Sequence, residues 1–308
     1  MTTQSPPVAT MPQKPRWPRR LWRLARSILL IFLLVTLVLS LMQKQLIFQG
    51  AASHGNPDSR VNPAPGEELL HLTAPSGEKI VALFGKALNT NGLPDPDAAH
   101  RPTLLYFYGN AMNLHDAALD IRDFRRLGLN VIVPDYAGYG MSCGEAGEPG
   151  CYAAAEAVYQ HLLTRTDIDP QKLIASGWSL GAAVAIEIAH KHTAEGHIIG
   201  IMTFSAFTSM DDLAQHLFPI LPVRLILKHH FKSQHRLAQL KLPILICHGQ
   251  LDSTIPFAMS QELAQTAANS GAKVTHLPIP GADHNDLFLV GEDQIHAAIL
   301  KFIADLGA

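Results

Sequence analysis

The first 57 residues contain no acidic side chain, because Asp58 is the first aspartate or glutamate in the chain. The same stretch holds seven lysines and arginines: Lys14, Arg16, Arg19, Arg20, Arg23, Arg26 and Lys44. Without them, 17 basic residues face 26 acidic ones, so the rest of the chain carries a formal charge of −9. Nucleic-acid binding needs a basic face, so this acidic body argues against nucleic acid as a partner.

Cysteine is also scarce, with three in 308 residues, too few for a disulfide-stapled scaffold. Cys143 and Cys151 lie in a turn-rich stretch and could pair in an oxidising compartment; the sequence leaves this open. Cys247 lies in an apolar run typical of a buried strand. No CxxC pair or Cys/His cluster has the spacing of metal ligands, so we predict no metal site.

Charge is missing again from residues 27–43, an apolar run between Arg26 and Lys44. Seventeen residues is the short end of what spans a bilayer, but Lys44 can snorkel and residues 46–48 extend the apolar length. Trp17 and Trp22 lie where an interfacial aromatic belt is expected. We therefore predict a basic tail over 1–23 and a transmembrane anchor over 24–48.

The excess of positive charge before this run places the N-terminus in the cytoplasm and the later residues on the extracytoplasmic side, which is the periplasm in a bacterium. A cleaved signal peptide is the alternative. Its apolar core is usually shorter, and the small residues at 50–52 lie well beyond the run. The uncleaved anchor is the better interpretation.

After a linker over 49–66, short apolar runs alternate with helical patterns, which predicts one domain over 67–308. The predicted strands are 68–73, 79–84, 103–108, 130–134, 173–177, 198–204, 244–248 and 273–277. The predicted helices are 115–127, 151–164, 180–191, 257–269 and 293–306. This βαβα rhythm indicates an α/β fold with a mostly parallel sheet covered by helices on both faces.

The segment 209–239 interrupts that rhythm. It is apolar, contains Pro219 and Pro222, and is long enough for two short helices. We interpret it as a small cap over the carboxyl edge of the sheet, with an ordinary crossover helix and a long loop as the alternative.

The sequence Gly177-Trp178-Ser179-Leu180-Gly181 matches G-x-S-x-G, between a predicted strand and a predicted helix. Five-residue patterns recur by chance, but this strand–turn–helix setting is that of a nucleophile elbow, which exposes the serine at the top of the sheet. Ser179 is therefore the candidate nucleophile.

A serine hydroxyl needs a base, and in this arrangement an acid and then a histidine follow the serine along the chain. Asp252 follows the strand at 244–248, and His284 lies on the loop after the last predicted strand. These two are the predicted acid and base; Asp211 or Asp212 is the alternative acid.

The fourth element is an oxyanion hole. Asn110 and Ala111 directly follow the strand at 103–108, so one backbone N–H is expected from either of them and the other from Leu180. A plain strand-to-helix turn, which glycine and asparagine also favour, is the alternative.

These motifs resemble the membrane-anchored branch of the α/β-hydrolase superfamily, which includes lysophospholipid lipases and protein depalmitoylases. The resemblance runs from residues 45–48 through the FYGNA loop, the sequence PDYAGYG at 134–140 and the elbow to Asp252 and His284. The family usually has histidine at position 108 and arginine at 137, where this chain has Tyr108 and Ala137. These two differences leave the triad untouched but lead us to expect altered substrate positioning near the oxyanion loop.

The resemblance implies a membrane-anchored serine hydrolase that cleaves a lipophilic ester or thioester without a cofactor. An aminopeptidase, an amidase or an acyltransferase would use the same three residues. A non-catalytic tethered binding module would usually lack one of them, and all three are present.

Overall fold

We analysed a computed structural model of the chain, which describes residues 19–307. The chain divides into two compact units at Leu41 and Met42. Helix α1 spans Arg19–Ile47, and its part Leu21–Ile47 is long and apolar enough to cross a membrane. Most of the predicted tail 1–23, including Trp17, lies outside the described residues.

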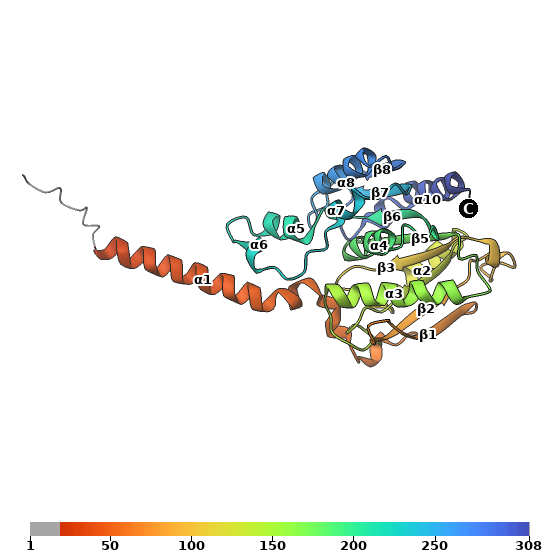
Figure 1. Cartoon of the computed structure of the whole chain (residues 1–308), viewed down its shortest axis with the longest axis horizontal. Coiled ribbons are helices and arrows are strands. Elements are labelled where there is room, and N and C mark those ends of the chain that lie inside the picture. Colours follow the sequence, from red (N-terminus) through yellow and green to blue (C-terminus); the bar gives the residue numbers. More distant parts are fainter. Residues whose placement is uncertain (1–18, 308) are drawn as a thin grey trace, which may run out of the picture. The chain divides into compact units, whose positions relative to one another are not determined.

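The larger unit is built on an eight-stranded sheet with the strand order β1-β2-β4-β3-β5-β6-β7-β8 (Figure 1). β2 is antiparallel to both of its neighbours, and the remaining pairs are parallel. The strands are β1 (Glu67–Thr73), β2 (Lys79–Gly85), β3 (Thr103–Phe107), β4 (Asn130–Pro134), β5 (Leu173–Trp178), β6 (Ile198–Phe204), β7 (Ile244–Gly249) and β8 (Val274–Ile279). Every predicted strand is present, with ends displaced by two residues at most.

Helices cover both faces of the sheet, as the sequence rhythm predicted (Figure 1). One face carries α3 (Glu148–Thr164), α4 (Leu180–Lys191), α7 (Ser233–Leu237) and α8 (Phe257–Asn269), which pack in sequence on one another. The other face carries α2 (Ala118–Arg126), the short α9 (Leu287–Val290) and α10 (Glu292–Leu306). The central strands are buried on both faces, which explains why they read as continuous apolar runs rather than alternating ones.

Two helix boundaries differ from the prediction for local reasons. α3 begins three residues earlier than expected, at Glu148, because Pro149 suits the first turn of a helix, where its missing N–H is not needed. α2 begins three residues later, because the Asn113 side chain accepts hydrogen bonds from the N–H groups of His115 and Asp116 and holds the chain in a turn.

The segment 49–66, expected as a linker, packs against the larger unit. It contains the 3-10 helices η1 (Gln49–Ser53) and η2 (Pro57–Ser59), and Gly50, Ser59 and Val61 are buried. The buried side chain of Val61 and the hydrogen bond that Ser53 Oγ accepts from the N–H of Gly140 hold it there, and Ser59 donates to the carbonyl oxygen of Ser53 within the segment. Glycine, proline and asparagine at these positions mark tight turns in this case, rather than a mobile tether.

The segment 209–239 forms α5 (Met210–Leu217), α6 (Val223–Ile226) and α7. The Ser209 side chain caps α5 by accepting a hydrogen bond from the N–H of Asp212, and Met210 and Leu213 bury its inner face. Pro219 and Pro222 lie in the turn between α5 and α6, where a continuous helix would be broken.

Candidate active site

Ser179 occupies a sharp turn between β5 and α4 with a backbone φ of 56°, a value that residues other than glycine rarely adopt. The turn closes only because glycines flank it. A Cβ on Gly181 would lie 1.9 Å from the carbonyl oxygen of Phe107, and one on Gly177 would lie 2.2 Å from the Gly181 backbone. The strand register places Gly177 beside Phe107, so the serine emerges next to the loop that follows β3.

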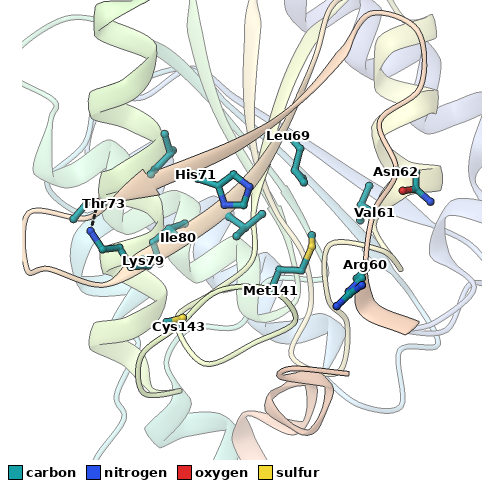
Figure 2. A pocket seen from close by; sticks show the side chains of 12 residues that line it. Arg60, Val61, Asn62, Leu69, His71, Thr73, Lys79, Ile80, Met141 and Cys143 are labelled. Carbon is teal, nitrogen blue, oxygen red and sulfur yellow. Dashed lines mark hydrogen bonds between the residues drawn. The ribbon is translucent and has the colours of Figure 1, made fainter. Parts of the chain in front are cut away.

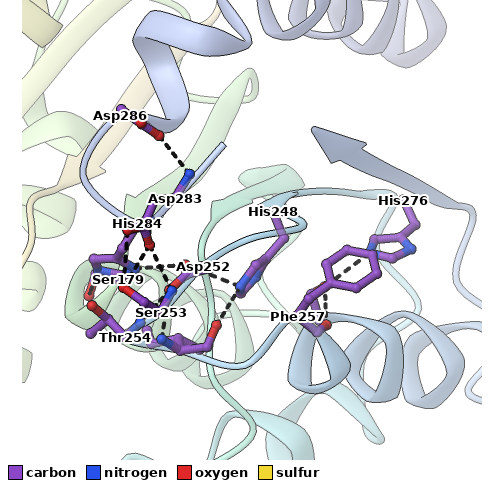
Figure 3. Close-up of polar contacts among 12 residues, drawn as sticks. Ser179, His248, Asp252, Ser253, Thr254, Phe257, His276, Asp283, His284 and Asp286 are labelled. Atoms are coloured by element: carbon purple, nitrogen blue, oxygen red, sulfur yellow. Dashed lines mark hydrogen bonds and ion pairs between the residues drawn. The ribbon is translucent and has the colours of Figure 1, made fainter. Parts of the chain in front are cut away.

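Asp252 and His284 lie on the loops that follow β7 and β8, which are adjacent strands. His284 Nε2 is 3.1 Å from Ser179 Oγ, and His284 Nδ1 is 2.8 Å from Asp252 Oδ2 (Figure 3). Because a carboxylate can only accept, the imidazole proton lies on Nδ1, and Nε2 is free to accept the serine proton. All three side chains are largely buried, so water screens these contacts weakly.

The Asp252 carboxylate is held ionised. Burial raises its pKa, but hydrogen bonds from His248 and His284, together with the N–H of Ile255, outweigh burial and hold the pKa below its usual range. The N–H groups of Thr254 and Ile255 donate to Oδ1 over 3.0 and 2.7 Å, which leaves Oδ2 for the histidines. An anion fixed in this position also orients the imidazole of His284.

The loop after β3 faces the elbow. A Cβ on Gly109 would lie 3.6 Å from Ser179 Cβ, so this loop passes close to the nucleophile. The backbone N–H groups of Asn110, Ala111 and Leu180 make no hydrogen bond within the described part of the chain. Free N–H groups beside a serine are what binding of an oxyanion requires.

Comparisons with known proteins identify the family of the chain. A family model described as phospholipase/carboxylesterase matches residues 153–289. The uncharacterized protein Rv2307c of Mycobacterium tuberculosis is 30% identical over 233 residues, which cover 75% of this chain and 80% of that protein. The chain belongs to the α/β-hydrolase superfamily. The predicted family and fold are thereby confirmed, and the family model supports the predicted enzyme class, a serine hydrolase.

Two further similarities bear on this hydrolase. The uncharacterized membrane protein YNL320W of Saccharomyces cerevisiae is 29% identical over 300 residues, which cover 93% of this chain and 99% of that protein. The structure of Thermogutta terrifontis esterase 2 phosphorylated by paraoxon superposes with a TM-score of 0.58 at 18% identity, over 80% of this chain and 98% of that one. At that identity the second similarity shows the fold alone.

Two residues beside the hydrolase site were missed by sequence reasoning. His248 Nε2 lies 2.9 Å from the carbonyl oxygen of Ile255 and 3.3 Å from Asp252 Oδ2. The indole of Trp178 stacks on the His284 ring, with centroids 5.3 Å apart. The spacing of His248, four residues before Asp252 at the end of a strand, was a usable signal; nothing in the sequence marked the Trp178 stack.

The alternative acids lie elsewhere. Asp211 pairs with His230, whose Nδ1 is 3.0 Å from Asp211 Oδ2. Asp212 accepts hydrogen bonds from Ser209 and Arg224. The structure brings neither carboxylate to His284, so Asp252 is the acid that the geometry supports.

The departure from the family pattern at position 108 has a structural consequence. Tyr108 is fully buried, and its hydroxyl donates to Asp135 Oδ1 over 2.9 Å. The N–H groups of Leu114 and Met141 donate to the same carboxylate. Tyr108 is therefore directed into the domain, where it joins the loop after β3 to the loop after β4.

The cysteines of the described residues are unbridged. Cys151 is buried in α3, whereas Cys143 is exposed and lines a cavity of about 610 Å³ beside β1 and β2 (Figure 2). Met141 and His71 line the same cavity, and Ser179, Asp252 and His284 do not. Within residues 19–307, no group of three or more His, Cys, Asp or Glu side chains is placed to hold a metal ion.

Proposed function

We propose that this chain is a membrane-anchored hydrolase that cleaves a lipophilic carboxylic ester or thioester through Ser179, His284 and Asp252. The observation that carries the proposal is the unbroken relay from the Ser179 hydroxyl through the imidazole to the Asp252 carboxylate, with contacts of 3.1 and 2.8 Å. Such a relay converts a weakly nucleophilic hydroxyl into an attacking group.

In the proposed reaction, Ser179 Oγ attacks the acyl carbonyl while His284 Nε2 accepts the hydroxyl proton. Asp252 keeps the imidazole in the required tautomer and stabilises its positive charge. The N–H of Leu180, together with that of Asn110 or Ala111, binds the oxyanion. His284 then protonates the leaving alcohol or thiol. Water, activated by the same histidine, releases the acid from the acyl-enzyme, and no metal or organic cofactor takes part.

The lipophilic character of the substrate is supported by two segments. Helix α1 would hold the enzyme at a bilayer, with the span at 24–48, the N-terminus in the cytoplasm and the catalytic domain on the other side. The segment 209–239 would serve as the cap of the site, and it exposes Ile220 and Leu225. A tethered enzyme with an apolar cap meets substrates that lie in or near the membrane.

The test is hydrolysis of p-nitrophenyl esters and acyl thioesters of increasing chain length by the full chain in detergent micelles. Ser179→Ala should abolish turnover and fluorophosphonate labelling, whereas Ser76→Ala, an exposed serine on the β1–β2 turn, should change neither. A preference for long chains supports the lipophilic substrate. If folded protein neither turns over any acyl substrate nor takes the label, the proposed function is wrong.

A further inference from the structure

Four large apolar side chains project from the α5–α6 turn. Leu217, Phe218, Ile220 and Leu225 are 52%, 37%, 84% and 86% exposed, and together they form what we call the cap ridge. Single exposed leucines are ordinary on protein surfaces, but several within one short segment mark an interaction site. The cap ridge therefore exceeds the scattered exposure of single apolar side chains that is ordinary on a protein surface.

The ridge is held in place by the residues beneath it. Val223 and Leu213 are buried on the inner side of the segment, and Arg224 donates to Asp212 over 2.6 Å, which ties α6 to α5. The inward positions therefore satisfy packing, and the outward apolar side chains are not needed by the core. They are therefore available to a partner outside the domain.

The position of the ridge along the chain identifies that partner. The Gln43 side chain is buried, donates to the carbonyl oxygen of Ile226 and accepts from the N–H of Lys228, over 3.1 and 2.8 Å. Gln43 is also the last residue of the uncharged run that begins at residue 27. The backbone next to Leu225 is thus fixed within one side-chain length of the end of that uncharged run.

The surroundings of Gln43 continue the apolar surface. Met42 and Leu46, on either side of it, are 46% and 43% exposed. Lys228 and Lys232, a few residues further along the cap, are exposed. Lysines close to a bilayer surface are attracted to anionic headgroups. An apolar ridge with flanking lysines is the composition of segments that lie in the interface of a bilayer.

We propose that the cap ridge inserts into the interfacial layer of the same bilayer that holds α1. The proposal rests on the membrane anchor of the proposed function. It places the cap at the lipid surface, so that an acyl chain reaches the site from the membrane without crossing bulk water.

The experiment uses the full chain in vesicles of phosphatidylcholine and phosphatidylglycerol, with Cys143→Ser to remove the exposed thiol. An environment-sensitive NBD label is attached at Ile220→Cys, and at Leu300→Cys on α10 as the control, because Leu300 is also an exposed aliphatic side chain. We expect blue-shifted emission at 220 and quenching by doxyl-labelled lipid at least threefold stronger than at 300. Equal emission and equal quenching at the two positions would overturn the proposal.

A second variant tests membrane docking of the cap ridge separately from catalysis. Ile220→Glu with Leu225→Glu should slow hydrolysis of a vesicle-borne ester at least fivefold and leave hydrolysis of a short soluble ester unchanged, whereas Leu93→Glu with Leu300→Glu should change neither. Equal loss on both substrates would count against docking. The Ser179→Ala protein should retain the quenching at 220, so failure of the proposed chemistry and failure of docking give different results.

A separate observation concerns the residue Gly50, just after α1. Its N–H donates to the carbonyl oxygen of Asn110 over 2.8 Å, and the Tyr139 hydroxyl donates to the same oxygen over 3.1 Å. A peptide group is planar, so fixing the Asn110 carbonyl also fixes the N–H of Ala111 in the opposite direction. That N–H is one of the candidate oxyanion donors.

Only glycine fits at position 50. A Cβ there would lie 2.3 Å from the carbonyl oxygen of Met112 and 2.4 Å from the ring of Tyr139. We infer that Gly50 is a positioning residue, through which the segment leaving the membrane sets the orientation of the 110–111 peptide. This inference also rests on the proposed function, because it assigns the peptide to the oxyanion hole.

The test compares Gly50→Ala with Ala52→Ser, an exposed change in the same 3-10 helix, in the full chain. We expect kcat to fall roughly ten- to hundredfold with KM changed less than twofold, since oxyanion contacts strengthen only in the transition state. Binding of a trifluoromethyl ketone, which forms an oxyanion on the enzyme, should weaken in parallel. If Gly50→Ala fails to fold, Tyr139→Phe, which removes the second hydrogen bond, should give a smaller loss of the same kind. Unchanged kcat in a folded variant, or a loss confined to KM, would overturn the inference.

Discussion

His248 and Asp252 are in contact inside the protein, with His248 Nε2 3.3 Å from the same carboxylate oxygen that accepts the hydrogen bond from His284. Nε2 also faces the carbonyl oxygen of Ile255 at 2.9 Å, and since both neighbours can only accept, Nε2 carries a proton. Its Nδ1 is buried and makes no hydrogen bond among the described residues. The acid of the proposed triad is thus held between two histidines.

We predict that His248→Leu lowers kcat roughly ten- to hundredfold, because a hydrogen bond to a charged group is lost and Asp252 is less well fixed. His276→Leu is the control, since His276 stacks on the other side of Phe257 and does not touch Asp252. Both variants are measured with the same ester. Equal activity of the two variants would show that His248 has only a packing role.

We predict that Gly249→Ala pushes apart the loops after β7 and β8, which carry Asp252 and His284. A Cβ at position 249 would lie 2.4 Å from the carbonyl oxygen of Ala282, two residues before His284. The free energy of unfolding should fall by roughly 2–4 kcal/mol, because backbone atoms cannot yield as a flexible side chain can. Urea unfolding gives the stability, and kcat should fall at least tenfold in the fraction that stays folded. A variant with full activity would show that the loops adapt.

Tyr108→Phe tests the departure from the family pattern. Removing a hydroxyl that donates to the buried Asp135 should reduce the free energy of unfolding by about 1–2 kcal/mol. Because this side chain is fully buried, the preferred acyl chain length should stay the same. A changed chain-length preference would show that Tyr108 influences substrate positioning, as the departure from the family pattern led us to expect.

Asp120 should make stability depend on pH. Burial raises the pKa of Asp120 to about 6 from 3.8, against a hydrogen bond from the Tyr106 hydroxyl that lowers it. Between these values the folded protein holds a proton that the unfolded chain releases, so stability falls as pH rises from about 4 to about 6. The loss is at most about 3 kcal/mol. Asp120→Asn should remove this slope and raise stability at pH 8, as measured by chemical unfolding at several pH values. An unchanged slope would contradict the prediction.

Much of this fold could be read from the sequence because central parallel strands are continuous apolar runs, and because Ser179, Asp252 and His284 each follow such a run. The carboxyl ends of parallel strands meet at one edge, so the order along the chain was enough to bring the three together. The helix starts at Glu148 and Ala118 depended on a proline and an asparagine side chain, which are local effects that periodicity does not register.

Contacts between segments distant in the sequence could not be predicted. The residues 49–66 have the composition of a linker, and only the folded domain shows that Gly50 lies against Asn110 and Gln43 against Ile226. The sequence shows a histidine at position 248, but its contact with Asp252 depends on how the loop after β7 folds back toward the strand. The composition of a segment indicates which conformations it adopts in isolation. The places of Gly50 and Gln43 are decided instead by the surface of the domain on which their segments pack.

The positive φ of Ser179 limits which chemistry this scaffold can acquire. A side chain branched at Cβ is strongly disfavoured in that conformation, so a threonine at the elbow would disrupt the turn even though it carries the same hydroxyl. Unbranched cysteine fits the same backbone. Evolution or design starting from this chain can therefore exchange oxygen for sulfur at the elbow more easily than it can add one methyl group.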